Sequence, residues 1–195
     1  MGWRWLPATA CLLVAALFLS GCAEPPNKEM DQAQGAIDAA LAAGASTYAA
    51  TEYSAATDAL KNATDAVTAR DYRLALNYAL ESREHAQNAA RGAADAKAAI
   101  RVEVHRLMAE IAALAKQGRA RLAVAERARV PSRLLEPPAN ALAAADAALQ
   151  EAGEAIAVAD DLAARAALDG VKEPVETALA AIDAAMSGRS PRRRR

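Results

Sequence analysis

Alanine makes up roughly 30% of the 195 residues, and this excess limits the folds that are open to the chain. Alanine is the strongest helix former because its side chain loses no conformational entropy in a helix. A methyl group removes little apolar area from water, so a deep globular core is not expected. We therefore predict an all-α fold of elongated, antiparallel helical hairpins that pack as in a coiled coil, with alanine seams between closely spaced helices.

Helix stop and cap signals divide the first half of the body. A first helix is predicted from Lys28 to Ala43, with Gly44 as its stop. Thr51 is expected to cap a second helix, with Glu52 favourably placed at its positive end. Apolar residues recur there at spacings of three and four, which predicts a seam formed by Tyr53, Ala56, Leu60, Ala63 and Val67.

A third helix is predicted after the break at Arg70-Asp71, with Asp71 as its N-cap. So short a turn predicts that this helix folds back antiparallel to the second. The pattern continues to about Arg129, and Gly92 or Gly118 is expected to bend or interrupt it. Its predicted seam comprises Ala79, Ser82, Ala86, Ala89, Ala93, Ala96, Ile100, Val104, Leu107, Ile111 and Leu114.

The second half begins after Pro131 and Pro137-Pro138, which are expected to close off the first. A fourth helix is predicted from Pro138 to Ala159, and a further segment begins at Asp160-Asp161. Asp169-Gly170 should break that segment before a last helix from Glu173 to Met186.

The two halves resemble each other when they are compared at a shift of 89 residues. Leu60 then falls on Leu149, Asp71 falls on Asp160, and a series of alanines falls on alanines. Abundant alanine makes chance matches frequent. A duplicated helical hairpin and two unrelated amphipathic helices with one period therefore both stay open.

The N-terminus carries a secretory signal pattern. Arg4 precedes an apolar run from Ala8 to Leu19, and about a dozen residues cannot cross a hydrocarbon core that needs about 20. The run ends in Leu19-Ser20-Gly21-Cys22, which resembles the bacterial lipobox. The resemblance implies cleavage between Gly21 and Cys22, with diacylglycerol on the Cys22 sulfur and an acyl chain, such as palmitate, on the new amine. An ordinary signal peptide with a chance cysteine is the alternative.

The same resemblance has two consequences for the mature protein. Ala23 follows the cysteine where an aspartate would favour retention, so the lipid anchor is expected at the periplasmic face of the outer membrane. Cys11 lies in the signal, so Cys22 is left alone and no disulfide is expected.

The predicted organisation has five segments. They are a lipoprotein signal peptide (1–21), a tether (22–27), a first helical hairpin with the long helix (28–130), a second helical hairpin (131–186) and a disordered basic tail (187–195).

A family resemblance lies in the first hairpin. Ala36-Ile37-Asp38-Ala39-Ala40, with Gly44-Ala45, Glu52-Tyr53 and Asp71-Tyr72, resembles the alanine-rich helical domain of unknown function in many Gram-negative lipoproteins. The resemblance covers roughly Glu29 to Ala98 and implies a helical hairpin, an envelope location and no assigned chemistry. Residues 71–86 are also similar to a tetratricopeptide repeat, but its period of 34 residues does not recur in the chain.

Charge is unevenly distributed. Without Arg4, Arg189 and Arg192 to Arg195, the chain has 17 basic and 24 acidic residues, so an acidic body precedes a basic tail. The tail could hold a phosphate-bearing lipid or an acidic partner, or could simply be solvated. A nucleic-acid partner is not expected for a secreted lipoprotein.

Residues that could carry chemistry are few. His85 and His105 lie 20 positions apart, about 30 Å along one helix, so they cannot share a metal. Glu81 and His85 could form a weak two-ligand site, but a solvated helix face explains them better. No nucleophile elbow, zinc motif or phosphate loop is present. We expect no catalytic residue, no metal and no cofactor, and hence no enzyme.

The aromatic residues of the mature chain are four tyrosines, Tyr48, Tyr53, Tyr72 and Tyr78. A core or turn-packing role is favoured over a partner-docking patch. The resulting hypothesis is a lipid-anchored helical module that holds an envelope protein partner in the periplasm. The alternative is a tetratricopeptide-like binding module for a peptide or envelope lipid.

Overall fold

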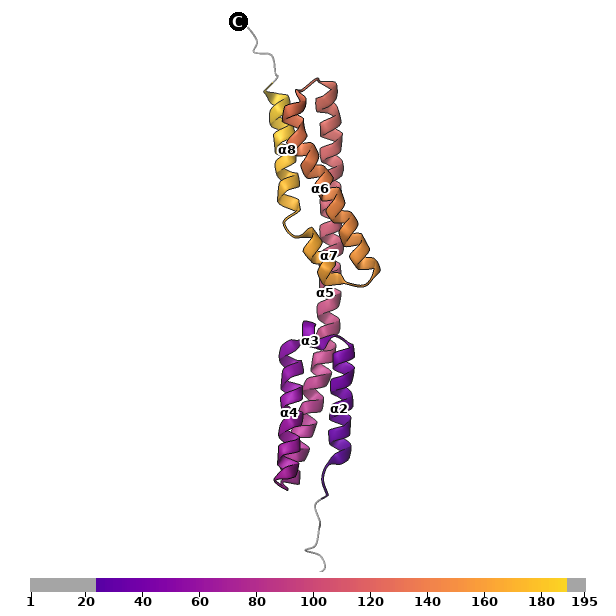
Figure 1. Cartoon of the computed structure of the whole chain (residues 1–195), viewed down its shortest axis with the longest axis vertical. Helices are drawn as coiled ribbons and strands as arrows, with labels where there is room; N and C mark the ends of the chain where they lie inside the picture. Colours follow the sequence, from indigo (N-terminus) through magenta and orange to yellow (C-terminus); the bar gives the residue numbers. More distant parts are fainter. Residues whose placement is uncertain (1–23, 189–195) are drawn as a thin grey trace, which may run out of the picture. The chain divides into compact units, whose positions relative to one another are not determined.

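The computed structural model describes residues 24–188, which form helices and no strand within that range (Figure 1). The helices are α2 (Asn27–Ala42), α3 (Ala45–Tyr48), α4 (Ala50–Thr68), α5 (Tyr72–Arg127), α6 (Ser132–Ala157), α7 (Asp161–Leu168) and α8 (Lys172–Ser187). The prediction of an all-α fold is confirmed.

The chain divides into two compact units between Ala94 and Asp95, within α5. The predicted segment boundary at 130/131 coincides with the turn between α5 and α6 instead. One long helix therefore contributes its first part to unit 1 (to Ala94) and its second part to unit 2 (from Asp95).

Unit 1 packs α2 and α4 against the first part of α5. Glu52 of α4 contacts His85, and the Ala56 carbonyl accepts a hydrogen bond from Ser82, so α4 and α5 run antiparallel as predicted. Arg83 donates to Gln32 on α2, and Ala40 shares an apolar cluster with residues further along α5, so α2 runs parallel to α5. The unit is a three-helix bundle (Figure 1).

Unit 2 packs α6, α7 and α8 against the rest of α5. Arg119 of α5 pairs with Asp146 of α6, whose chain runs back along α5. Lys172 pairs with Glu110, and Asp183 pairs with Arg121. The sequence separation is the same in both pairs, so α8 runs parallel to α5. α7 has the same direction, because Asp161 pairs with Arg101 and Arg165 with Glu103.

The seam of α5 is where the pattern placed it. Ala79, Ser82, Ala86, Ala89, Ala93, Val104 and Ile111 are all fully buried. The seam of α4 differs from the prediction, because the buried positions are Ala56, Ala59, Ala63 and Ala66. Tyr53 and Leu60 lie at its edge, half-buried against a neighbouring cluster. Alanines occupy the line of closest approach, since larger side chains there would push the helices apart.

Two predicted helix details are wrong, and the long helix lacks the interruption that was one of two outcomes predicted for it. Thr51 does not cap α4, which begins at Ala50 after α3, a short helix that the sequence did not signal. Pro137-Pro138 do not precede the fourth helix, since α6 begins at Ser132 and contains both prolines. The long helix is not interrupted at Gly92 or Gly118.

Gly118 owes its place to packing. A Cβ there would lie 2.6 Å from Cδ2 of Leu142, which is itself buried. The glycine therefore lets α6 approach α5 closely.

The predicted breaks at Asp71 and Asp160 are confirmed, and their turns share most of their hydrogen bonds at a shift of 89 residues. Asp71 Oδ1 accepts from the Leu74 amide at 3.0 Å, and Asp160 Oδ1 accepts from the Ala163 amide at 2.9 Å. The preceding residues, Arg70 and Ala159, both have positive φ, at 57° and 59°. Arg129, after the end of α5, also has a positive φ, but no aspartate caps the helix that follows. The same backbone turn therefore occurs outside the proposed repeat, and it does not by itself establish a duplication.

Residues 1–23 and 189–195 lie outside the described part of the chain. The predicted signal peptide, the Gly21–Cys22 cleavage site, the Cys22 lipidation site and nearly all of the basic tail fall there. Within residues 24–188, no helix is both long enough and apolar enough to cross a membrane.

Candidate functional site

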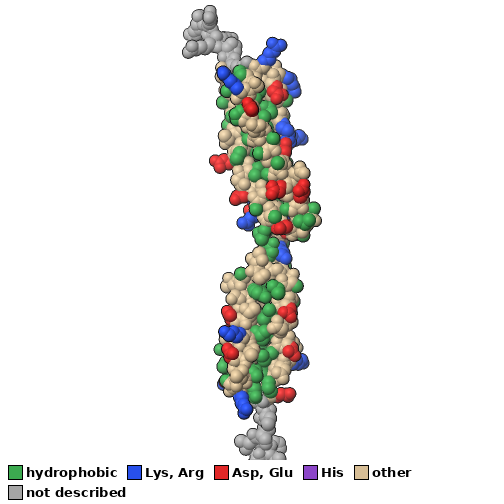
Figure 2. All heavy atoms as spheres, in the orientation of Figure 1, with side chains coloured by type: hydrophobic (Ala, Val, Ile, Leu, Met, Phe, Trp, Pro, Cys, Tyr) green, Lys and Arg blue, Asp and Glu red, His purple; other side chains and the backbone are tan. Residues whose placement is uncertain are grey.

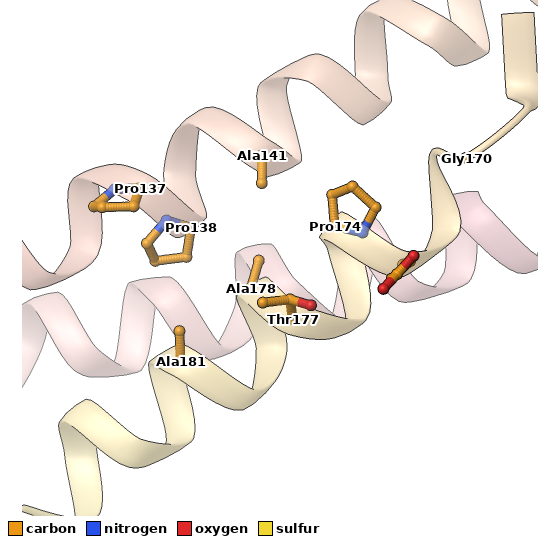
Figure 3. Close-up of a pocket in the computed structure, with 9 residues that line it drawn as sticks. Pro137, Pro138, Ala141, Gly170, Pro174, Thr177, Ala178 and Ala181 are labelled. Carbon is orange, nitrogen blue, oxygen red and sulfur yellow. The ribbon is translucent and has the colours of Figure 1, made fainter.

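An apolar groove between α6 and α8 is a candidate binding site in unit 2. Its volume is about 390 Å³. In Figure 3, the proline rings and alanine methyls of the two helices face the space between them. The lining residues are Pro137, Pro138, Ala141, Gly170, Glu173, Pro174, Thr177, Ala178 and Ala181.

The groove forms because small side chains face each other where longer ones would fill the space. Pro137 and Pro138 have no amide hydrogen, so the Arg133 and Leu134 carbonyls lose their usual helical donors. Leu142 and Val175 lie in the buried cluster that holds this part of unit 2 together. The only acidic residue of the lining is Glu173, so the groove suits an apolar group and offers no pair of residues for acid–base chemistry.

A buried carboxylate fixes the start of α7. Asp161 is 2% exposed, and its two oxygens accept from Nε and Nη2 of Arg101 at 3.2 and 3.0 Å. The hydrogen bond and the charge of Asp161 raise the pKa of Arg101 above its ordinary value. A paired buried carboxylate of this kind has a structural explanation, because removing the arginine would leave a buried charge without a partner.

A second ion pair fixes the start of α8. Nζ of Lys172 lies 2.9 Å from Oε2 of Glu110. The hydrogen bond raises the pKa of Lys172 and lowers the pKa of Glu110. Both side chains are partly exposed, so the pair orients α8 more than it stabilises the fold.

The two histidines lie in different units. Nδ1 of His85 lies 2.7 Å from Oε2 of Glu52, and its Nε2 lies 3.8 Å from Oε1 of Glu81. His105 is exposed on the part of α5 that belongs to unit 2. The solvated-face interpretation is wrong for His85, which is half-buried and hydrogen-bonded across two helices. No cluster of three or more histidine, cysteine or acidic side chains suitable for a metal occurs among residues 24–188.

Two of the four tyrosines pack in the interior of unit 1 as predicted. Tyr48 and Tyr53 lie against the cluster of Ala40, Ala45, Ala89 and Ala93, between the helices of unit 1. Tyr72 lies at the start of α5 beside residues 24–29, where Pro26 is buried. Residues 24–29 and the first turn of α5 therefore line a common hollow.

The contact between His85 and Glu52 was missed by sequence reasoning, although a signal for it existed. In two antiparallel helices joined by a turn, residues equally far from the turn lie side by side. Glu52 and His85 lie at similar distances on either side of the turn at Arg70-Asp71, and so do Ala56 and Ser82. The groove had no such signal, because it depends on two prolines inside α6 that were predicted to lie before the helix or at its first residue.

The comparisons with known proteins place a domain of unknown function, DUF4398, over residues 28–104. This range includes the three helices of unit 1 and agrees with the resemblance noted over Glu29 to Ala98. No curated protein and no solved structure matches the chain.

Proposed function

We propose that this chain is a non-enzymatic lipoprotein of the bacterial envelope whose helical body holds or spaces a protein partner in the periplasm. The observation that carries the proposal is Leu19-Ser20-Gly21-Cys22 directly after an apolar run of signal-peptide length. Two or more acyl chains at Cys22 would give stable attachment to a membrane, because one chain binds only marginally. Ala23 after the cysteine favours the outer membrane.

The described fold supports this role through the short connection between anchor and body. Pro26 is buried and α2 begins at Asn27, so few residues separate Cys22 from the bundle. A lipid on Cys22 would therefore hold the end of unit 1 where α2 and α5 begin close to the membrane surface. The alanine-lined bundle offers a folded body rather than a catalytic centre.

The anchor is tested by replacing Cys22 with serine, which removes the sulfur that accepts diacylglycerol. Labelled palmitate should enter the wild-type protein in cells and should not enter Cys22→Ser. Replacement of Ser20 by alanine is the matched control, since it keeps a small residue before the cleavage site and should keep the label. Equal labelling of the wild type and Cys22→Ser would rule out a lipid anchor.

The groove between α6 and α8 favours a second candidate function, a binding module for a peptide or an envelope lipid. Ala181 lines the groove, and its neighbour Ala180 is exposed outside it. Ala181→Glu should abolish co-purification of a membrane partner, while Ala180→Glu should not. If both variants retain the same partner, the groove is not its binding site and the first function stands alone.

A further inference from the structure

Unpaired arginines gather at the end of unit 2 where α5 turns into α6. Arg127 is the last residue of α5, Arg129 lies in the turn, and Arg133 is the second residue of α6. All three are exposed, and none forms an ion pair within the described chain. We call these three residues the arginine end.

The arginines elsewhere in unit 2 behave differently. Arg101, Arg106, Arg119, Arg121 and Arg165 each pair with a carboxylate. In Figure 2, acidic side chains gather around the turn between α6 and α7, and basic ones gather toward the arginine end. Glu126 and Glu136 are the acidic residues nearest in sequence to the arginine end, and neither is in an ion pair with it.

The end of α8 packs beside the turn between α5 and α6. Ile182, Ala185 and Met186 of α8 pack against Ala125, Val130 and Leu135, which lie on both sides of the turn. α8 ends at Ser187, and five of the seven residues after Gly188 are arginine.

Helix dipoles do not account for the positions of all three arginines of the arginine end. A cation is favourable near the C-terminus of a helix, which explains Arg127 and Arg129. Arg133 lies in the first turn of α6, which has no acidic residue, and there the dipole disfavours a cation. An anion outside the described chain would account for Arg133 as well as for the other two.

An apolar surface adjoins the arginines. Leu134 is 47% exposed directly after Arg133. It lines a hollow of about 550 Å³ together with Pro131, Ala181, Ala184, Ala185 and Gly188. Guanidinium groups bind phosphate oxygens in pairs, and the hollow would receive hydrocarbon. The combination fits a ligand that has a phosphate group and an apolar chain in the same molecule.

We propose that the arginine end docks on an anionic phospholipid surface, with Arg127, Arg129 and Arg133 on the phosphates and Leu134 with its hollow against the acyl-chain region. A nucleic acid would satisfy the arginines but would leave Leu134 and the hollow uncovered. This contact goes beyond the proposed function and does not depend on lipidation of Cys22, so either one can fail alone.

The test uses the chain from residue 23 to 195, which retains every contact that the structure describes. Its binding is measured by flotation with phosphatidylcholine vesicles that contain or lack phosphatidylglycerol. We expect binding only with phosphatidylglycerol, weakened by salt because these charges are exposed. Three arginines near such a surface predict a loss on the order of 100-fold for the triple variant Arg127→Gln, Arg129→Gln, Arg133→Gln.

The matched control is the triple variant Lys61→Gln, Arg70→Gln, Arg73→Gln in unit 1. It removes the same charge, its residues are exposed and outside any ion pair of the described chain, and Arg70 has the positive φ that Arg129 has. Its binding should change less than about 3-fold, which is under one arginine's contribution. Equal losses in the two variants, or equal binding to both kinds of vesicle, would overturn the proposal.

The apolar part is tested with Leu134→Gln, and Leu80→Gln on α5 is its control because Leu80 is similarly exposed. Leu134→Gln should weaken vesicle binding several-fold while Leu80→Gln leaves it unchanged. If the two variants bind vesicles alike and a single-stranded DNA displaces the vesicles, the arginine end is a polyphosphate site and the lipid assignment is wrong. Circular dichroism of each variant verifies that the helices are intact.

Discussion

The two units are built on the same helix but have different interiors. Among the described residues of unit 1, the buried apolar residues are alanines except for Pro26 and Ile37. In unit 2 the buried positions include Val104, Ile111, Leu142, Val175 and Ile182. Helices that meet through alanine must lie close together, whereas branched side chains fill a wider space between helices.

This difference determines how each unit responds to substitution. A unit held by alanines has little apolar area to lose at any one site, but it has no room for added atoms. A unit held by branched residues loses more when one is truncated, because a cavity remains. Truncation should therefore be most damaging in unit 2, and enlargement should be most damaging in unit 1.

The largest expected effect is for truncation in unit 2. Ile111 is fully buried within the main cluster of that unit. Ile111→Ala should lower the free energy of unfolding by about 3 to 4 kcal/mol, measured by urea denaturation followed by circular dichroism. Val102→Ala on the same helix is the control, because Val102 is 70% exposed and its truncation should cost less than about 0.5 kcal/mol. Similar losses in both variants would contradict the proposed core.

Enlargement in unit 1 should have the next largest effect. Ala86 is fully buried in a cluster with Ile37 and Ala56, so it meets both neighbouring helices. Ala86→Leu should destabilise the protein by about 1 to 3 kcal/mol, because the helices must separate to admit the new atoms. Ala39→Leu on the exposed side of α2 should be nearly neutral. An Ala86→Leu protein as stable as the wild type would mean that unit 1 is more loosely packed than its alanines indicate.

Replacing glycines by alanine should change stability less than these core substitutions do, and it compares positions with and without room for a side chain. Gly35 in α2 and Gly153 in α6 have nothing within 4 Å of an added Cβ, so alanine there should stabilise by up to about 1 kcal/mol. At Gly118 the new Cβ would meet Leu142 at 2.6 Å, and Leu142 is buried and not free to move aside. Gly118→Ala should therefore give no gain in thermal denaturation. A gain equal to that of the other two would show that Leu142 can repack.

Most of the helical layout could be predicted from sequence because its signals are local. Gly44, Asp71, Asp160 and Gly170 each fixed a helix end through backbone conformation or capping, and the α5 seam followed from its period. α3 and the prolines within α6 were missed because they depend on packing between segments. Pro138 is buried against its neighbours, and this tertiary contact outweighs the local preference to end a helix at proline.

The candidate sites could be predicted less well than the fold. A lipid anchor is specified by a contiguous motif, so Leu19-Ser20-Gly21-Cys22 could be identified directly. The groove joins residues of α6 and α8 that are distant in sequence. The residues of the arginine end are close in sequence, but the hollow beside them adds residues of α8. The spacing of apolar residues shows which face of a helix is apolar. It does not show which pairs of helices leave a groove between them.

The smallest expected effect concerns pH and belongs to unit 1 alone. The hydrogen bond that His85 donates to Glu52 raises the pKa of His85 above 6.5; partial burial opposes this, and the charges of Glu52, Glu81 and Glu84 reinforce it. The folded state then binds the proton more tightly than the unfolded state, so the stabilisation is complete below pH 6.5 and is lost as pH rises through the raised pKa.

Glu52→Gln should remove most of this pH dependence, because Oε2 of Glu52 is 2.7 Å from the ring of His85. Glu81→Gln should remove less, because its oxygen is 3.8 Å away. The free energy of unfolding, measured between pH 6 and 8.5 for the wild type and both variants, separates these effects from the carboxylate titrations at lower pH. A pH dependence that is the same in Glu52→Gln and the wild type would mean that the bond between α4 and α5 does not hold the proton.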